Sequence, residues 1–237
     1  MPLIPAGELS LDVRALLGTR EGHPDGGPYS RPATAWPIGS ADAVLARRRA
    51  VRQFTDGAVA PQGVQTIIER AREAERAVWP AEAHGAIEYT VLVAALRMTG
   101  FAPGLYLSVD DSAAGPFSEL AAAPWLDSLR AAYADAACLL LICADISAAG
   151  RSGSTQYGPL LIRAGTLGYG AWLSAISLGL AGCVYAGPHH RITEAVRLVD
   201  GRSNHIFTVS LGHARPLAGY PGHDTGEGHD DDNVDGP

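Results

Sequence analysis

The stretch from Leu160 to Leu180 is almost entirely apolar, and it constrains the fold more than any other part of the sequence. Its length suits one long helix, and the charge of Arg163 and several interspersed glycines argue against a segment that crosses a membrane. A helix that is apolar on every side has to be buried. The sequence therefore predicts a long helix in the core of a folded domain.

Other segments predict further helices and strands. After Pro61, which suits the first turn of a helix, apolar residues recur at helical spacing at Val64, Ile67, Ile68 and Ala71. Shorter helices are expected after Ser40, which can cap a helix that runs into Arg47–Arg49, and over Thr193–Val199. Strands are expected over Ile87–Leu96, Leu105–Val109, Ala136–Ala144 and His205–Leu211. Four helices and four strands in a mixed order predict an α+β fold or a three-layer α/β sandwich.

The chain of 237 residues suits one domain with tails. Residues 1–38 are rich in Gly and Pro, and we expect an extended arm that packs on a partner subunit. Residues 39–216 are the expected folded domain. Residues 217–237 are rich in Gly and Asp, which predicts a disordered acidic tail.

Charge and cysteine content narrow the class of protein. The net charge of -7 gives no reason to expect a nucleic-acid partner. Residues 1–17 lack the apolar segment of a signal peptide, so we expect neither secretion nor a membrane. Three cysteines at this spacing indicate neither a disulfide framework nor a metal site, and we expect buried free thiols in the cytoplasm.

Arginines gather in two places. Every one of the 18 basic residues is arginine, because the sequence has no lysine. Arg47, Arg48, Arg49 and Arg52 follow the first expected helix, where they can satisfy its last carbonyls or clamp a phosphate with forked donors. The last expected strand ends in Gly212, and strand alternation points the next two basic side chains, His213 and Arg215, the same way. Each signal is weak alone, and both suit an anion.

Taken together, these segments resemble a known family. RRAVRQF (48–54) resembles the N-terminal arginine signature of the nitroreductases, and LGHARP (211–216) resembles the segment that completes their FMN phosphate site. GLAGCVYAG (179–187) resembles the stretch that passes the flavin ring. The three occur in the family's order, and the resemblance covers about residues 40–216.

The resemblance implies a nitroreductase-like three-layer sandwich that binds FMN across a homodimer interface. It implies phosphate and ribityl contacts for the residues that match the signatures, namely Arg48, Arg49, Arg52, His213 and Arg215. Ala50 replaces the usual Ser of the first signature, so one hydrogen bond is missing. Ala186 and Gly187 would present backbone groups to the isoalloxazine ring. The apolar helix over Leu160–Leu180 is the candidate for the dimer seam, because its small residues allow close packing.

A subfamily resemblance concerns the substrate. GFAPGLYLSV (100–109) and AVWPAE (77–82) resemble stretches of the SagB-type dehydrogenases, which oxidise azolines to azoles in ribosomally made peptides. QYGPLLIRAG (156–165) resembles their segment with a Lys-Tyr pair that takes part in proton abstraction. Tyr157 matches the tyrosine, whereas Gln156 stands in place of the lysine. The Ser and Gly that usually precede the second stretch are replaced by Ala74 and Arg76.

Three functions follow from these residues. The leading hypothesis is an FMN-dependent azoline dehydrogenase acting on a modified precursor peptide, with Tyr157 and Gln156 in the catalytic positions. Gln cannot act as a base, and a tyrosine needs a nearby cation such as Arg163 or a histidine to become one. The first alternative is an FMN reductase of a small molecule or enone that takes hydride from NAD(P)H. The second is a degenerate, non-catalytic subunit that docks on a partner biosynthetic enzyme or a peptide leader.

Overall fold

The protein is built around one sheet. The structure, a computed structural model, describes residues 41–84, 87–109, 116–121, 124–147 and 157–216. Within them, six strands lie in the order β3-β2-β1-β4-β6-β5, and every neighbouring pair is antiparallel. The strands are β1 (Thr90–Ala95), β2 (Gly104–Ser108), β3 (Phe117–Ala121), β4 (Cys138–Ala144), β5 (Ala181–Ala186) and β6 (Asn204–Gly212).

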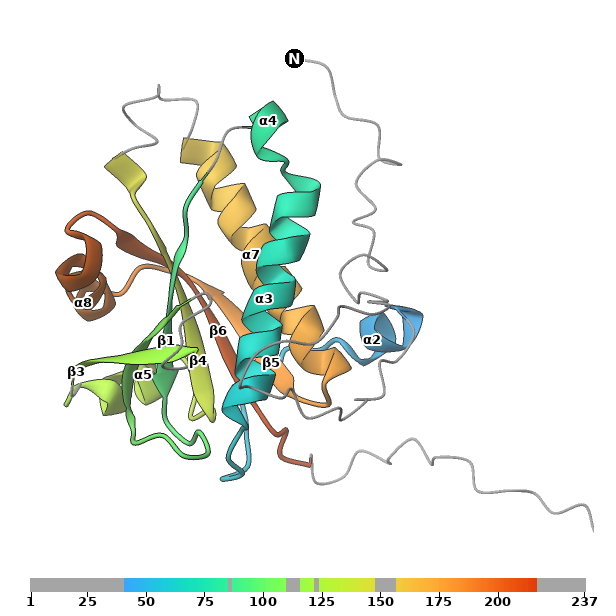
Figure 1. Cartoon of the computed structure of the whole chain (residues 1–237). Helices are drawn as coiled ribbons and strands as arrows, with labels where there is room; N and C mark the ends of the chain where they lie inside the picture. The colour runs from blue at the N-terminus through green and yellow to red at the C-terminus, as the bar shows by residue number, and fades with distance from the viewer. Residues whose placement is uncertain (1–40, 85–86, 110–115, 122–123, 148–156, 217–237) are drawn as a thin grey trace, which may run out of the picture.

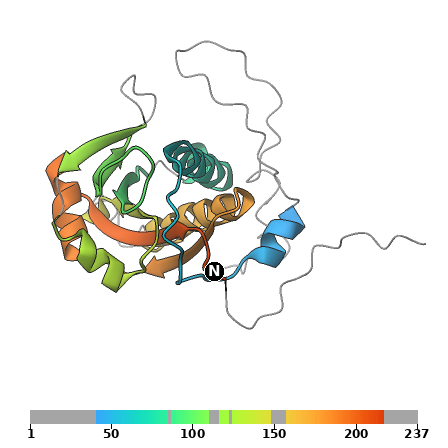
Figure 2. The same cartoon turned by 90° about the horizontal axis from the view of Figure 1, so that it is seen from below.

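Helices cover both faces of this sheet. They are α2 (Ala41–Arg47), α3 (Pro61–Val78), α4 (Ala81–His84), α5 (Leu126–Ala132), α7 (Tyr157–Ser177) and α8 (His190–Asp200). Helices α3 and α7 lie side by side on one face, whereas α5 and α8 lie on the other, and α2 lies against the outside of α7 (Figures 1 and 2). The expected three-layer sandwich is confirmed, and its sheet is antiparallel.

The central strands explain the three layers. All seven residues of β4 are buried, as expected for a strand with apolar residues on both sides. Leu140 and Ile142 pack into the core beneath α3 and α7, whereas Leu139 and Leu141 pack into the core beneath α5 and α8. Because successive side chains of a strand point to opposite faces, such a strand has to lie between two layers of helices.

The predicted core helix is α7. It begins three residues earlier than expected, at Tyr157, and ends at Ser177. Gly168 fits against the sheet without a side chain, because a Cβ there would lie 2.3 Å from a ring carbon of Phe207. Among the helices that the structure describes, none combines the length and the apolar character needed to cross a membrane.

A buried ion pair joins α7 to α3. The Arg163 Nε lies 2.6 Å from a carboxylate oxygen of Glu75, and the two side chains are only 3% and 6% exposed. At the end of α3, the Trp79 indole N–H donates to the Thr166 hydroxyl at 3.3 Å. These polar contacts set how the two helices lie against each other inside an otherwise apolar layer.

Some elements carry no clear signal in the sequence. Strand β5 was expected only as a stretch of backbone beside a ligand, yet it pairs with β6 along its whole length. Its Gly182, a poor strand former, is required by close packing, since a Cβ there would lie 2.7 Å from the Ser210 carbonyl oxygen. Strand β3 and helix α5 are too short to show a period. The arm (1–38), the tail (217–237) and Ser40 lie outside the described residues.

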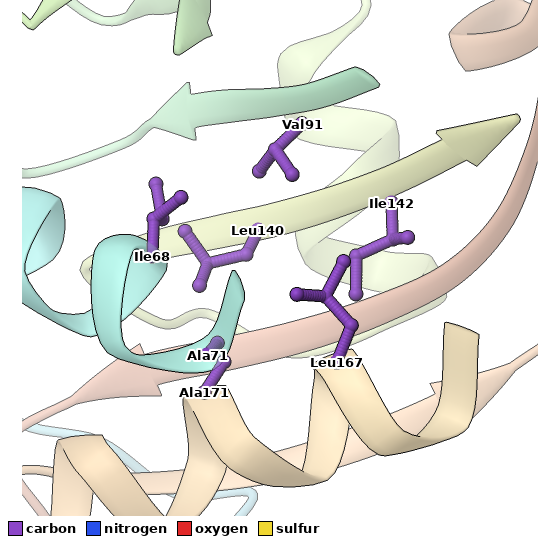
Figure 3. Close-up of a pocket in the computed structure, with 7 residues that line it drawn as sticks. All are labelled: Ile68, Ala71, Val91, Leu140, Ile142, Leu167 and Ala171. Carbon is purple, nitrogen blue, oxygen red and sulfur yellow. The ribbon is translucent and has the colours of Figure 1, made fainter. Parts of the chain in front are cut away.

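A small apolar cavity lies between α3, α7 and the sheet (Figure 3). Its volume is about 10 Å³, and it is lined by Ile68, Ala71, Val91, Leu140, Ile142, Leu167 and Ala171. This space has room for about one water molecule, but none of these side chains can hydrogen-bond to it, so we expect the cavity to be dry.

Filling this cavity should stabilise the protein. Val91 points into it from β1 (Figure 3), and Val91→Ile adds one methylene without losing the β-branched shape. We expect a gain of about 0.5–1 kcal/mol in the free energy of unfolding, measured in urea. Val93→Ile is the matched control, because Val93 is fully buried on the same strand but does not line the cavity. It should overpack the core and cost about 1–3 kcal/mol. A loss in both variants would contradict the prediction.

Candidate functional site

The structure brings the two arginine-bearing segments side by side. The backbone N–H of Thr55 donates to the carbonyl of His213 at 2.8 Å, and the N–H of Arg215 donates to the carbonyl of Gln53 at 3.0 Å. The segment after α2 therefore pairs with the chain that leaves β6, although the two are far apart in sequence. The expectation that both signatures contribute to one place fits this pairing.

The same segment also borders the edge strand β5. The Val51 N–H donates to the Gly182 carbonyl at 2.9 Å, and Ala50 forms a parallel bridge with Gly182. Gly212 allows the close approach on the β6 side, because a Cβ there would lie 2.9 Å from the Phe54 ring. Phe54 itself is buried and anchors the segment. The basic residues are thus carried by backbone that is fixed to the sheet at two points.

The basic side chains of this edge are exposed. They are Arg48, Arg49, Arg52, His213 and Arg215. Within the described residues, none of the four arginines forms an ion pair with a carboxylate. Concentrated positive charge without acidic partners suits an anion, and forked guanidinium donors suit a phosphate group in particular.

Two of these arginines lie over aromatic rings. The Arg48 guanidinium carbon is 5.4 Å from the ring centroid of Trp172 on α7, and that of Arg52 is 5.7 Å from the ring centroid of Tyr185 on β5. A side-chain hydrogen bond with Cys183 raises the pKa of Arg52 above its ordinary value. The Arg52 guanidinium therefore lies against β5, whereas that of Arg48 lies against α7.

Ala186 and Gly187 lie at the C-terminal end of β5, whereas Gly182, which pairs with Val51, lies near its beginning. Ala181 pairs with Gly212 and Ala186 with Phe207, so roughly 16 Å of strand separates the two ends. Ala186 is exposed, and the carbonyl of Gly187 accepts a hydrogen bond from the Tyr133 hydroxyl at 3.5 Å. Arg52 lies over Tyr185, near the Ala186 end, so the length of β5 separates Ala186 from Arg48 rather than from every arginine. A ligand that contacts both Arg48 and Ala186 has to be extended along the edge of the sheet.

Tyr157, the described member of the expected catalytic pair, is not near Arg48 in the subunit. Tyr157 is the first residue of α7 and is 47% exposed, whereas Gln156 lies outside the described residues. Trp172, beneath Arg48, lies about four turns further along the helix, or roughly 22 Å away. Arg163, one of the cations that could make Tyr157 a base, is bound to Glu75.

A cluster of aromatic and histidine rings near Gly187 was not predicted. His189 stacks on His190 at 5.4 Å and on Trp125 at 6.4 Å. The backbone N–H of His189 donates to Nδ1 of His205 at 3.0 Å. The sequence signal for this cluster was a histidine, His205, next to the apolar residues Ile206 and Phe207 of a strand.

His205 is a neutral structural histidine. Burial lowers its pKa from the ordinary value of 6.5 to about 4. Because Nδ1 accepts a hydrogen bond, the proton lies on Nε2, which is 3.1 Å from the Phe207 carbonyl oxygen and 2.9 Å from the Thr208 hydroxyl. Within the described residues, no group of three or more His, Cys, Asp or Glu side chains is placed to hold a metal ion.

His205 should make the protein sensitive to acid. The unfolded chain takes up a proton at His205 below pH 6.5, whereas the folded protein does so only near pH 4, so stability is lost as the pH falls through this window. We expect a loss on the order of 3 kcal/mol from this group. His205→Gln keeps an acceptor and a donor but cannot titrate, so urea unfolding at pH 7 and pH 4.5 should show a smaller difference in the variant. Equal differences in both proteins would contradict this assignment.

Comparison with known proteins gives the fold. The sequence matches no protein-family model, and no curated protein matches it. Among solved structures, a Ralstonia eutropha protein assigned as a nitroreductase is 19% identical with a TM-score of 0.56, over 80% of this chain and 89% of that one. A chain of the Escherichia coli microcin synthetase McbBCD complex, solved with truncated pro-MccB17 bound, is 16% identical with a TM-score of 0.55, over 81% and 79%.

A third similar structure is much longer. An Anabaena variabilis protein assigned as a nitroreductase is 17% identical with a TM-score of 0.50, and it aligns with 73% of this chain. The present chain covers 38% of that protein. The three-layer sandwich with its antiparallel sheet is the fold that these structures share with the chain. The protein therefore has the nitroreductase fold.

Proposed function

We propose that the protein is an FMN-dependent oxidoreductase whose arginine-lined edge binds the FMN phosphate. The observation that carries this proposal is the backbone pairing that places Arg215 beside Gln53 and His213 beside Thr55. It gathers the basic residues of two distant segments at one place. No salt bridge within the described part of the chain uses up their charge.

The residues of this edge fit FMN in charge and in length. Arg48, Arg49, Arg52 and Arg215 would hold the phosphate and ribityl chain, with His213 beside them. The backbone at the exposed Ala186 and the half-buried Gly187 would border the isoalloxazine ring, because it lies far enough along β5 from Arg48 for an extended ligand. Bound FMN supplies the capacity to accept or donate a hydride, and the protein contributes binding and orientation.

The proposed reaction is the oxidation of an azoline ring to an azole in a modified precursor peptide. Support comes from the resemblance of residues 77–82, 100–109 and 156–165 to SagB-type dehydrogenases, and from the fold shared with a chain of the microcin synthetase complex. The oxidation removes one hydride and one proton from ring carbons. Tyr157 is the proposed residue for proton abstraction, with Gln156 beside it in sequence, and its exposed side chain is accessible to a peptide. Because Arg163 is bound to Glu75, this role requires another cation to make Tyr157 a base.

A homodimer is part of the proposal. The first turns of α7 expose Leu161 and Ile162, which are 38% and 59% accessible, next to the exposed ring of Tyr157. Apolar side chains grouped on one helix indicate a surface that a second copy covers. Tyr157 begins α7, about four turns before Trp172, the residue beneath Arg48. A site shared between two subunits would account for this separation. We expect this dimer to work in the cytoplasm with a partner biosynthetic enzyme.

A second candidate function is a non-catalytic docking subunit. It is favoured by the absence of lysine from the chain, since Gln156 in the position of the usual base cannot accept a proton. The exposed arginines nevertheless argue that such a subunit would still bind FMN.

The visible spectrum of the purified protein, followed by anaerobic addition of NADPH, separates these functions. We expect a flavin absorption band that NADPH does not bleach, because the electrons come from the peptide substrate. Rapid bleaching would instead identify an NAD(P)H-dependent reductase of a small molecule or enone. A colourless protein that cannot be reconstituted with FMN would overturn both enzyme functions and leave the docking subunit.

A further inference from the structure

Each of two arginines at the proposed FMN site lies over an aromatic ring, one on α7 and one on the edge strand β5. Arg48 lies over Trp172 at 5.4 Å, and Arg52 lies over Tyr185 at 5.7 Å, both within the range of a cation–π interaction. Arg48 forms no ion pair with any carboxylate that the structure describes. The faces of these rings therefore help to determine where the guanidinium groups lie, together with the Cys183 hydrogen bond in the case of Arg52.

The two rings are themselves fixed. Trp172 is only 5% exposed, and its Cδ1 lies so close to Gly182 that a Cβ there would be 3.0 Å away. Tyr185 belongs to β5 and contacts the Tyr133 ring edge-on, with centroids 5.3 Å apart. Both rings are thus anchored to the same strand, at its beginning and near its end.

The indole N–H of Trp172 does not explain why a tryptophan stands here. Its Nε1 is buried and has no hydrogen-bond partner among the described residues. A buried donor without a partner costs free energy, so the benefit of the side chain has to come from its ring. Of the aromatic residues, tryptophan has the face that attracts a cation most strongly.

We propose that Trp172 and Tyr185 are positioning residues that hold Arg48 and Arg52 in place for the phosphate-bearing ligand. This inference rests on the proposed function, because FMN is the ligand. An arginine side chain that is ordered before binding loses less conformational entropy when the ligand arrives. The rings act through the arginines and need not contact the ligand.

The test is a double-mutant cycle on FMN affinity, measured by fluorescence titration of the full chain. Trp172→Leu removes the ring but keeps an apolar side chain, and it should weaken FMN binding about two- to fivefold. Trp172→Phe keeps a ring and should restore most of the affinity. In an Arg48→Ala background, Trp172→Leu should have almost no further effect, because the arginine that it positions is gone.

Tyr185 provides an independent arm of the same experiment. Tyr185→Leu should weaken FMN binding about two- to fivefold, Tyr185→Phe should not, and the loss should vanish in an Arg52→Ala background. Because Tyr185 is half-buried in an edge strand, this arm also serves if Trp172→Leu fails to fold, which thermal unfolding will show.

Two results would overturn this inference and leave the proposed function standing. One is that the Leu variants bind FMN as the wild type does. The other is that the loss of FMN affinity persists unchanged when the arginine is absent. The second would mean that the rings support the fold or touch the ligand directly. A wild-type protein that binds no FMN would overturn the proposed function and this inference together, since there would be no ligand for the arginines to meet.

Discussion

Arg48→Ala combined with Arg215→Ala should strip FMN from the protein. Each guanidinium is expected to make charge-assisted hydrogen bonds to the phosphate, which contribute about 1.5–3 kcal/mol each. Losing both should weaken FMN binding by about two to four orders of magnitude. The ratio of flavin to protein absorbance after purification measures occupancy, and a fluorescence titration with added FMN measures the change in Kd.

The matched control removes two positive charges elsewhere. Arg76 and Arg197 are exposed residues of α3 and α8, away from the two paired segments, so Arg76→Ala with Arg197→Ala changes the net charge equally. We expect nearly full flavin occupancy in this control. If the Arg48 and Arg215 double variant still purifies fully yellow, the phosphate lies elsewhere and the proposed site is wrong.

Glu75→Ala should destabilise the protein strongly, because it breaks the buried ion pair between α3 and α7. The substitution leaves the Arg163 guanidinium, 3% exposed, without the carboxylate 2.6 Å from its Nε. Breaking a buried ion pair by removing one partner costs about 3–5 kcal/mol. For a chain of this length we expect Tm to fall by roughly 6–20 °C in a calorimetric scan of the FMN-free protein.

Two controls test the physical reason. Glu73→Ala, at an exposed position of the same helix, should change the free energy of unfolding by less than about 0.5 kcal/mol. Glu75→Leu combined with Arg163→Met replaces both charges by apolar groups and should recover most of the lost stability. A Glu75→Ala variant as stable as wild type, or a double variant as unstable as Glu75→Ala, would contradict this account of the α3–α7 interface.

The apolar core residues on the two faces of the sheet could be predicted because local sequence patterns indicate them. Val64, Ile67, Ile68 and Ala71 recur at helical spacing, and all four are buried on the inner face of α3. The apolar run over Ala136–Ala144 predicted a strand, and β4 contributes side chains to the cores on both faces of the sheet. Such signals depend only on neighbours in the chain, so they can be read without knowing the fold.

Strand β5 could not be predicted in this way. Its residues, AGCVYA, begin with small side chains that disfavour a strand when isolated. Pairing with β6 and the close approach of Trp172 to Gly182 make this segment a strand. Contacts between residues that are distant in sequence therefore determine this strand, despite the low strand propensity of its first residues.

The candidate site also has features that the sequence determines and features that only the folded structure determines. The sequence by itself determined which residues carry positive charge, that Gln156 replaces a base, and that the segments around Arg48 and Arg215 each suit an anion. Only the tertiary structure decided that these segments pair, that Trp172 and Tyr185 lie beneath two arginines, and that Arg163 is bound to Glu75. The reason is physical: chemical type and local period belong to each segment, whereas distance and burial arise only when the chain folds.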